Sequence, residues 1–143
     1  MADLAFFVGN WAIDGEGVDF TGKPFKISAH YLVAFDLDGA WLSASGEILG
    51  AKLREYWGYD ARKHEFLRIQ FQSNGTFTVL HSTGCRKDTL LWDGEGHAPN
   101  GELFVLRSNQ VREDADSMLV TWERHTGTSW KVYSTERLRR IAG

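Results

Sequence analysis

Several features that would point directly to a function are scarce or absent in this chain of 143 residues. Its single cysteine, Cys85, cannot form a disulfide within the chain, so a reducing compartment is natural. No stretch approaches the roughly 18 apolar residues of a membrane-spanning helix. The first residues also lack the basic segment and apolar run of a signal peptide. We therefore expect a cytoplasmic protein with no membrane span.

Charge of one sign does not accumulate anywhere along the chain. The formal net charge is −3, and no block of like charge exceeds a few residues. Nucleic acids and anionic membranes bind proteins through clusters of basic side chains. The sequence therefore predicts that neither is a partner, and it leaves a homodimer open.

Sequence motifs for metals, phosphates and nucleophilic catalysis are absent as well. There is no His-x-His or Cys-x-x-Cys pair, and the five histidines are too scattered for a zinc motif. Gly15-Glu16-Gly17 does not continue into a glycine-rich phosphate loop, and no Gly-x-Ser-x-Gly elbow exists. We expect no metal ion and no bound cofactor.

What the sequence does contain is a high share of aromatic residues, with six Trp, nine Phe and four Tyr. Apolar and polar residues alternate in short runs, which are separated by turn signals such as Asn74-Gly75. Strands are predicted at residues 11–20, 25–35, 41–49, 52–59, 66–72, 76–82, 89–92, 102–108, 117–124 and 129–138, after a short helical turn at 3–8. This series predicts an all-β protein that forms a single domain. We expect one antiparallel barrel of about 8–10 strands, wide enough for one small ligand.

Three short motifs follow one another along the chain. Gly9-Asn10-Trp11 lies near the N-terminus, Gly58-Tyr59-Asp60 ends a predicted strand, and Gln72-Ser73-Asn74-Gly75-Thr76 forms a later turn. In this order they resemble the calycin superfamily of lipocalins and fatty-acid-binding proteins, and in particular an uncharacterised bacterial family of lipocalin-like domains. The resemblance implies a closed barrel with an internal cavity and an arginine of the last strand packed over the tryptophan. The candidate arginines are Arg137, Arg139 and Arg140.

The first strand also resembles a second family. A Gly-x-Trp motif followed by a stretch like Gly15-Glu16-Gly17 is similar to the start of nitrobindin-like haem proteins. That resemblance implies a haem-ligating histidine on a strand close to the C-terminus. The last predicted strand, 129–138, contains no histidine, and His125 falls in a predicted turn. Haem binding is therefore the weaker alternative.

Candidate site residues follow from the face of each strand that points into the barrel. In the second predicted strand the aromatic face is expected inward, which places Tyr31 in the interior. In the strand at 76–82, an inward Phe77 and Val79 would carry His81 into the cavity. The predicted ligand-binding residues are Tyr31, Trp57, Phe71, Phe77, Val79, His81, Arg107 and Trp122.

The inward faces of two strands, at 52–59 and 102–108, cannot be chosen from alternation alone. Both faces of each strand carry large apolar residues. Arg107 therefore points either into the barrel or out of it. Arg54 and Glu55 are most simply a solvated pair on a strand.

These residues predict a protein that binds a small, largely apolar organic molecule inside the barrel. A competing prediction is an enzyme for isomerisation, dehydration or cyclisation. In it, His81 would act as acid or base and Tyr31 would donate a hydrogen bond to developing negative charge. A third prediction is a structural protein whose barrel is filled by its own side chains. The sequence does not choose between turnover and binding.

Overall fold

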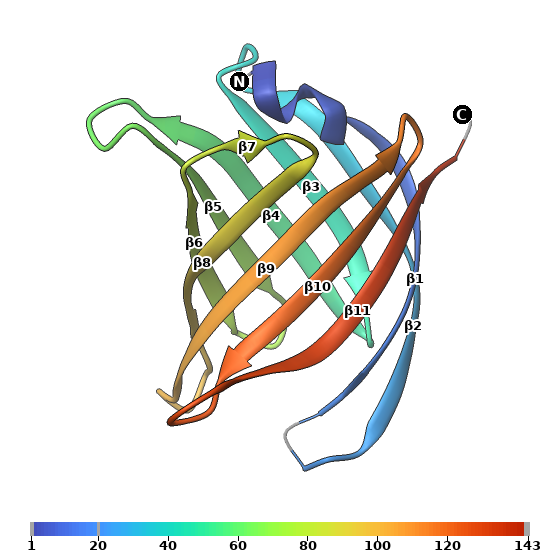
Figure 1. Ribbon diagram of the computed structural model, residues 1–143, viewed down its shortest axis with the longest axis vertical. Coiled ribbons are helices and arrows are strands. Elements are labelled where there is room, and N and C mark those ends of the chain that lie inside the picture. The colour runs from blue at the N-terminus through green and yellow to red at the C-terminus, as the bar shows by residue number, and fades with distance from the viewer. Residues whose placement is uncertain (1, 20, 142–143) are drawn as a thin grey trace.

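The computed structural model describes residues 2–19 and 21–141, and its strands wind into a closed barrel (Figure 1). A 3-10 helix, η1 (Ala2–Phe7), precedes the strands. The strands are β1 (Gly9–Val18), β2 (Pro24–Asp36), β3 (Trp41–Ile48), β4 (Ala51–Asp60), β5 (Glu65–Gln72), β6 (Phe77–Ser82), β7 (Cys85–Arg86), β8 (Thr89–His97), β9 (Leu103–Asp114), β10 (Ser117–His125) and β11 (Trp130–Arg140). The predicted all-β class, antiparallel barrel and N-terminal helical turn are confirmed.

The barrel is a simple meander of ten strands. Strands that are neighbours in the chain pair with one another. The two-residue β7 is an exception, because it pairs only with β8. The barrel wall is continuous there because β6 pairs directly with β8. The first strand, β1, closes the barrel against β11, with Trp11 opposite Arg140 and Ile13 opposite Leu138. Antiparallel strands joined by short hairpins leave alternate side chains pointing inward. The side chains in the interior are therefore those of every second residue of the ten strands.

Close backbone contacts explain two glycine-rich stretches. A Cβ on Gly17 would lie 2.0 Å from the carbonyl oxygen of Tyr133, so β1 and β11 approach more closely there than a side chain allows. A glycine inside a strand often marks such a close approach of two backbones. A Cβ on Gly94 would lie 1.9 Å from the Val79 carbonyl oxygen. The residues after Trp92, predicted as a loop, therefore continue β8, because their glycines let β8 pack against β6.

The end of another predicted strand also differs. The strand predicted at 102–108 extends through Asp114 as β9, because it pairs with β10 well beyond its apolar stretch. The first strand was predicted to end at Phe20, which lies outside the described residues. No helix in the described part of the chain is long and apolar enough to cross a membrane.

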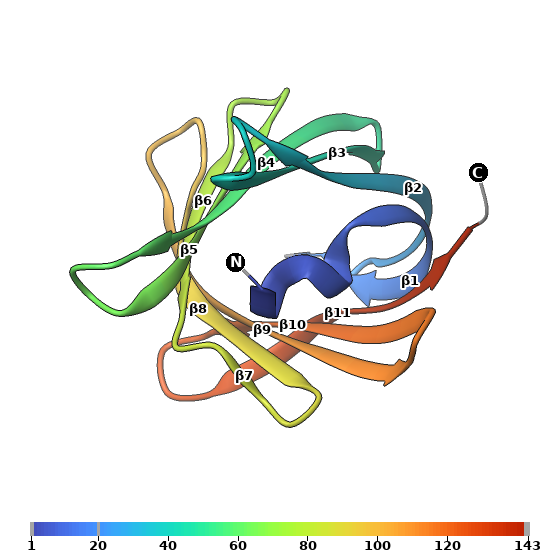
Figure 2. The ribbon, with the colours of Figure 1, turned by 90° about the horizontal axis from the view of Figure 1, so that it is seen from above.

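One end of the barrel, here called the closed end, is covered by η1 (Figure 2). Leu4 and Phe7 of this helix are buried, and Trp11 beneath it is fully buried. The indole Nε1 of Trp11 donates a hydrogen bond to the carbonyl oxygen of Phe7 at 2.9 Å. The tryptophan therefore fixes the helix over the end of the barrel.

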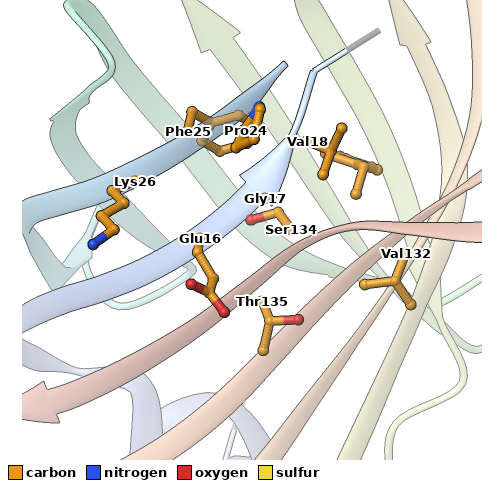
Figure 3. A pocket seen from close by; sticks show the side chains of 10 residues that line it. Glu16, Gly17, Val18, Pro24, Phe25, Lys26, Val132, Ser134 and Thr135 are labelled. Atoms are coloured by element: carbon orange, nitrogen blue, oxygen red, sulfur yellow. The ribbon is translucent and has the colours of Figure 1, made fainter. Parts of the chain in front are cut away.

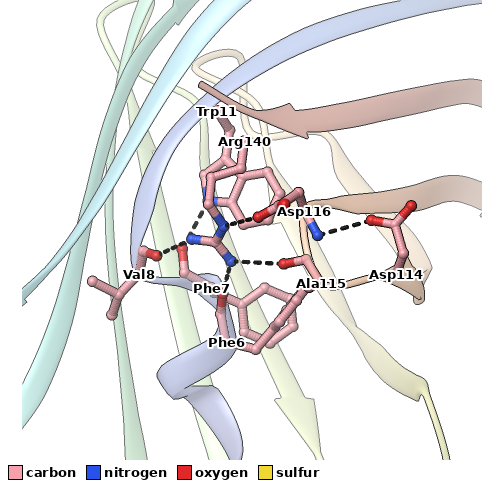
Figure 4. A network of polar contacts seen from close by, with 8 residues as sticks. All are labelled: Phe6, Phe7, Val8, Trp11, Asp114, Ala115, Asp116 and Arg140. Atoms are coloured by element: carbon pink, nitrogen blue, oxygen red, sulfur yellow. Dashed lines mark hydrogen bonds and ion pairs between the residues drawn. The ribbon is translucent and has the colours of Figure 1, made fainter. Parts of the chain in front are cut away.

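Arg140 of β11 packs over Trp11, with its guanidinium carbon 4.3 Å from the ring centroid (Figure 4). The same guanidinium donates hydrogen bonds to the carbonyl oxygens of Phe6 and Val8, and its Nε lies 3.2 Å from a carboxylate oxygen of Asp116. The expected contact between Trp11 and an arginine of the last strand is confirmed. It joins the start of the barrel to its last strand.

Candidate functional site

The barrel interior contains a cavity of about 450 Å³. It reaches the end opposite η1, here called the open end, where its lining includes Val18, Leu49 and Asn74 beside hairpin turns. Val18 is 44% exposed and Leu49 is 62% exposed, so the cavity meets solvent there. The apolar part of its lining comprises Ile13, Val18, Phe25, Ile27, Ile48, Leu49, Ala51, Leu53, Ala98, Phe104, Leu106, Val120, Trp122 and Leu138. A small molecule can therefore enter a largely apolar space.

Three polar side chains in the cavity wall contact one another and are called here the inner polar cluster: Tyr31 of β2, Glu55 of β4 and Arg68 of β5. Arg68 Nε donates to Glu55 Oε1, and the Tyr31 hydroxyl donates to Glu55 Oε2. Glu55 is 1% exposed, Arg68 4% and Tyr31 7%. Burial, together with the negative charge of Glu55, raises the pKa of Tyr31 well above its usual value, so its proton stays on the hydroxyl.

The guanidinium of Arg68 lies among three tryptophan rings. Its central carbon is 4.5 Å from the ring centroid of Trp57, 5.4 Å from that of Trp122 and 5.8 Å from that of Trp92. Burial alone would lower the pKa of Arg68, but the charge and hydrogen bond of Glu55, together with Tyr31 and Glu136, outweigh this effect and raise the pKa. Arg68 is therefore a permanent cation, held by one carboxylate and by aromatic faces.

Two buried nitrogens in this region make no hydrogen bond to any described residue. They are Arg68 Nη1 and Trp57 Nε1. By contrast, Trp92 Nε1 donates to Gln110 Oε1 at 2.8 Å. Buried donors are rarely left without an acceptor in proteins, because the missing bond costs about 1–3 kcal/mol. The inner polar cluster therefore has donor capacity that the protein itself does not use.

A second carboxyl group of the cavity wall, Glu136, comes from β11. Burial raises its pKa to about 7, against the lowering effects of a hydrogen bond from Ser134 and of the charge on Arg68. The Ser134 hydroxyl donates to Glu136 Oε1 at 3.2 Å. At neutral pH, Glu136 is thus divided between its protonated and ionised forms, next to a cavity that could hold a ligand.

Three of the eight predicted site residues lie in or beside the cavity. Tyr31 and Trp122 line it, as their strand faces predicted. Trp57 is fully buried between Phe7 and Trp92, with ring centroids at 5.1 Å and 5.7 Å. It therefore fills the closed end behind the cavity, in contact with Arg68. Their role in binding stays a prediction.

The inward phase predicted for β6 is wrong. Thr78 is buried and lines the cavity, whereas Phe77 is 41% exposed and stacks on His97 at 4.4 Å between ring centroids. Val79 and His81 share the outer face with Phe77, and His81 Nδ1 lies 3.0 Å from a carboxylate oxygen of Glu65. The outer face of β6 thus carries Phe77 and Val79, while its inner face carries two small polar residues, Thr78 and Ser82, on either side of Leu80. The alternation therefore predicted the opposite phase.

Two further predicted site residues, Phe71 of β5 and Arg107 of β9, also lie on the outside of the barrel; the direction of Arg107 had been left open. Phe71 is 50% exposed on the outside of β5, because Arg68 and Gln70 point inward. Arg107 lies on the outside of β9, pairs with Glu123 and packs over the ring of Trp130 at 4.2 Å. Neither Phe71 nor Arg107 lines the cavity, so the structure does not bring these predicted residues together with Tyr31.

The residues that sequence reasoning missed are the charged ones. Glu55 was interpreted as half of a solvated pair, and Arg68 and Glu136 were not considered as site residues. One signal was present: Leu53, Glu55 and Trp57 occupy one face of a strand, so an inward Trp57 carries the carboxylate with it. An acidic residue between two large apolar residues of the same face therefore indicated a buried charge.

No histidine appears among the described residues that line the cavity. His81 is on the outer face, and His125 packs its ring against Trp130 at the end of β10. The side chains of the cavity therefore do not fit a haem held by a histidine. The described residues also contain no group of three or more His, Cys, Asp and Glu side chains placed to hold a metal ion.

A second hollow, of about 530 Å³, lies where the β1–β2 hairpin meets β11 (Figure 3). Val18, Phe25, Tyr133 and Ser134 line both this hollow and the interior cavity. The hollow thus adjoins the cavity near its open end. Because the buried inner polar cluster lies only in the interior cavity, we take that cavity as the candidate site.

Comparisons with known proteins support the fold. No protein-family model matches the chain, and no curated protein matches it significantly. Among solved structures, Rv2717c from M. tuberculosis has a TM-score of 0.75 at 16% identity, over 99% of this chain and 96% of that chain. The S-type phycobiliprotein lyase CPES from Guillardia theta has a TM-score of 0.62 at 9% identity, over 96% and 90%.

A third structure is a protein of unknown function from the DUF3598 family of Nostoc punctiforme. Its TM-score is 0.60 at 10% identity, and the match covers 96% of this chain but 49% of that one. At these identities the similarity extends to the fold alone. The chain therefore shares a β-barrel fold with these three proteins, and any function has to be argued from its own residues.

Proposed function

We propose that this protein binds one small, largely apolar organic molecule in the interior of its barrel. The observation that carries the proposal is a cavity of about 450 Å³ with an apolar wall, an opening to solvent and a compact polar cluster. Ligand sites usually combine such a wall with a few polar groups that orient the ligand. The likeness to a phycobiliprotein lyase is in keeping with a barrel that accommodates a small molecule.

The buried charges favour a binding site over a barrel filled for stability. Glu55 and Arg68 are almost fully buried, and burying an ion pair usually gains no more stability than apolar side chains of similar volume would. A barrel that served only as a scaffold would have little use for this pair. We infer that the pair is retained for what it contacts inside the cavity.

Two substitutions at neighbouring positions of β6 test the proposal. Thr78→Trp places an indole in the cavity, whereas Val79→Trp places the same indole on the outer face. An apolar fluorescent dye should bind the parent protein at one site per chain. Thr78→Trp should abolish binding, and Val79→Trp should leave the affinity within about twofold of the parent. Fluorescence titration measures both, and circular dichroism checks that each variant folds.

Either of two other results for the Thr78→Trp protein would contradict the proposal. If the Thr78→Trp protein folds and still binds the dye at full strength, the dye does not occupy the interior and the proposal is wrong. An unfolded Thr78→Trp protein would indicate an interior without room for an indole. The alternative would then be a barrel filled by its own side chains.

A second candidate function, acid–base catalysis on an enclosed substrate, is favoured by one observation. The pKa of Glu136 is raised to about 7 by burial, and a general acid or base works best when its pKa lies near the working pH. His81, predicted for that role, lies on the outer face. Mass spectrometry of a molecule that co-purifies, before and after incubation with the protein, separates the two functions. A binder returns it unchanged.

A further inference from the structure

We propose that the ligand is uncharged and carries a carbonyl oxygen, which accepts a hydrogen bond from Arg68 beside the inner polar cluster. This inference rests on the proposed function, because it names the chemical class of molecule that the same cavity binds. It is drawn from the hydrogen bonds and charges of the residues that form the cavity wall.

The hydrogen-bond inventory around Arg68 has more donors than acceptors. Both oxygens of Glu55 are already in use, one by Arg68 Nε and one by the Tyr31 hydroxyl. Arg68 Nη1 has no acceptor among the described residues, and neither has Nε1 of Trp57, whose ring centroid lies 4.5 Å from the guanidinium carbon. Guanidinium and indole N–H groups can only donate. A ligand that completes this inventory has to supply oxygen acceptors and not donors.

The charges of the cavity wall favour an uncharged acceptor. Arg68 is the only basic residue among the described residues that line the cavity, and Glu55 already neutralises it. Glu136 and, near the open end, Asp19 add further acidic groups. A ligand carboxylate would bring another negative charge next to Glu55 and Glu136 in a largely apolar cavity, at a desolvation cost. A ligand cation would have to approach the buried guanidinium.

A carbonyl oxygen avoids both costs. It accepts hydrogen bonds through two lone pairs and adds no net charge. A hydrogen bond that involves a charged donor contributes more than one between neutral partners, because the donor carries part of the positive charge. The apolar remainder of such a molecule would contact the aliphatic and aromatic wall, in which Trp122 and Phe104 take part.

Three dyes that share one ring system test the proposal on the intact protein. Prodan carries a ketone on a dimethylaminonaphthalene ring, plain dimethylaminonaphthalene lacks the ketone, and dimethylaminonaphthoate carries a carboxylate in its place. We expect prodan to bind about tenfold more tightly than the plain ring, which is the usual contribution of a hydrogen bond to a charged group. The carboxylate dye should bind more weakly than prodan at neutral pH. The emission of bound prodan should show a hydrogen-bonded carbonyl.

Two variants assign the preference to Arg68. The double substitution Glu55→Gln with Arg68→Met removes the charge pair as a unit, so no buried charge is left without a partner. It should bind the plain ring as the parent does and lose the preference for prodan to within about twofold. Arg54→Met changes an exposed arginine on the outer face of β4 and should keep the full preference.

The outcomes separate this inference from the proposed function. Equal affinity for prodan and the plain ring would overturn the carbonyl inference while leaving an apolar binding site in place. Tightest binding of the carboxylate dye would overturn the claim that the ligand is uncharged. If none of the three dyes binds, the proposed function fails and the inference fails with it. The three affinities of the parent protein decide these points even if the double variant does not fold.

Discussion

Two arginines of this barrel pack over tryptophan rings at nearly the same distance but differ in their hydrogen-bond partners. Arg140 lies 4.3 Å from the ring centroid of Trp11 at the closed end, and Arg68 lies 4.5 Å from that of Trp57 in the interior. Arg140 donates to backbone carbonyl oxygens on the N-terminal segment and reaches an aspartate. Arg68 is paired with one glutamate, and its Nη1 has no acceptor among the described residues.

The difference shows how hydrogen bonds distinguish a structural contact from the binding contact that we propose. The guanidinium of Arg140 is occupied by the protein's own carbonyl groups, so it holds two segments of the chain together. The guanidinium of Arg68 faces a cavity with bonding capacity to spare. The ring contact alone would not distinguish them. Three predictions follow from this contrast, and they are ordered by the size of the expected effect.

The largest effect is expected at the closed end. Trp11→Ala removes a fully buried indole and should lower the free energy of unfolding by about 3–5 kcal/mol, as other large-to-small changes in cores do. Urea denaturation measures this loss. Because Trp11 does not line the cavity, dye affinity at low denaturant should be unchanged. A variant as stable as the parent would show that Trp11 does not hold the closed end together.

In the interior, replacing Arg68 alone should lower the free energy of unfolding more than replacing Arg68 and Glu55 together. Arg68→Met leaves the carboxylate of Glu55 buried without its cation and should lower the free energy of unfolding by about 3 kcal/mol. Adding Glu55→Gln should restore most of that loss, because the amide still accepts the hydrogen bond from Tyr31. Chemical denaturation of the three proteins measures the coupling. Additive losses would mean that the two residues do not act as a pair.

The smallest effect concerns pH. The pKa of Glu136 is about 7 in the folded protein against an ordinary value of 4.5, so between these values the folded state binds more protons than the unfolded state. Stability from this group is therefore complete below about pH 4.5 and is lost as the pH rises through 7. The full difference between these two pKa values corresponds to about 3 kcal/mol. Because Glu136 is partly exposed, solvent screening should reduce the measured decline to about 1–2 kcal/mol. Glu136→Gln should flatten it, and an unchanged slope would contradict the shifted pKa.

The fold could be predicted from the sequence because it depends on patterns that repeat. Alternation and turn signals recur along ten strands, so an error at one strand end leaves the barrel intact. The contact of Trp11 with an arginine of the last strand was expected from the resemblance to the calycins, which left Arg137, Arg139 and Arg140 as candidates. The structure identifies the arginine as Arg140. The extension of β8 was missed because Gly94 and Gly96 indicate a loop until the neighbouring backbone is known.

The candidate site was less predictable, and the reason is physical. An inward face is usually recognised by being apolar, but here the inward face of β6 carries Thr78 and the outward face carries Phe77 and Val79. Arg68 and Glu55 contradict the same rule, since each is stable in the interior only because the other is present. Glu55 and Arg68 lie on different strands, so a prediction that treats each strand separately cannot recognise them as a buried ion pair. They become visible when the register brings the strands together.

The pairing of β1 with β11 has a consequence for how the protein is made. Arg140 and Val8, which it bonds, are 132 positions apart in sequence. Contacts between distant parts of a chain form late in folding, because the loop between them has to close first. While synthesis proceeds, β1 therefore has an edge without its final partner until β11 has emerged from the ribosome. The cavity is enclosed only at that moment, so a ligand can be bound only by a finished barrel.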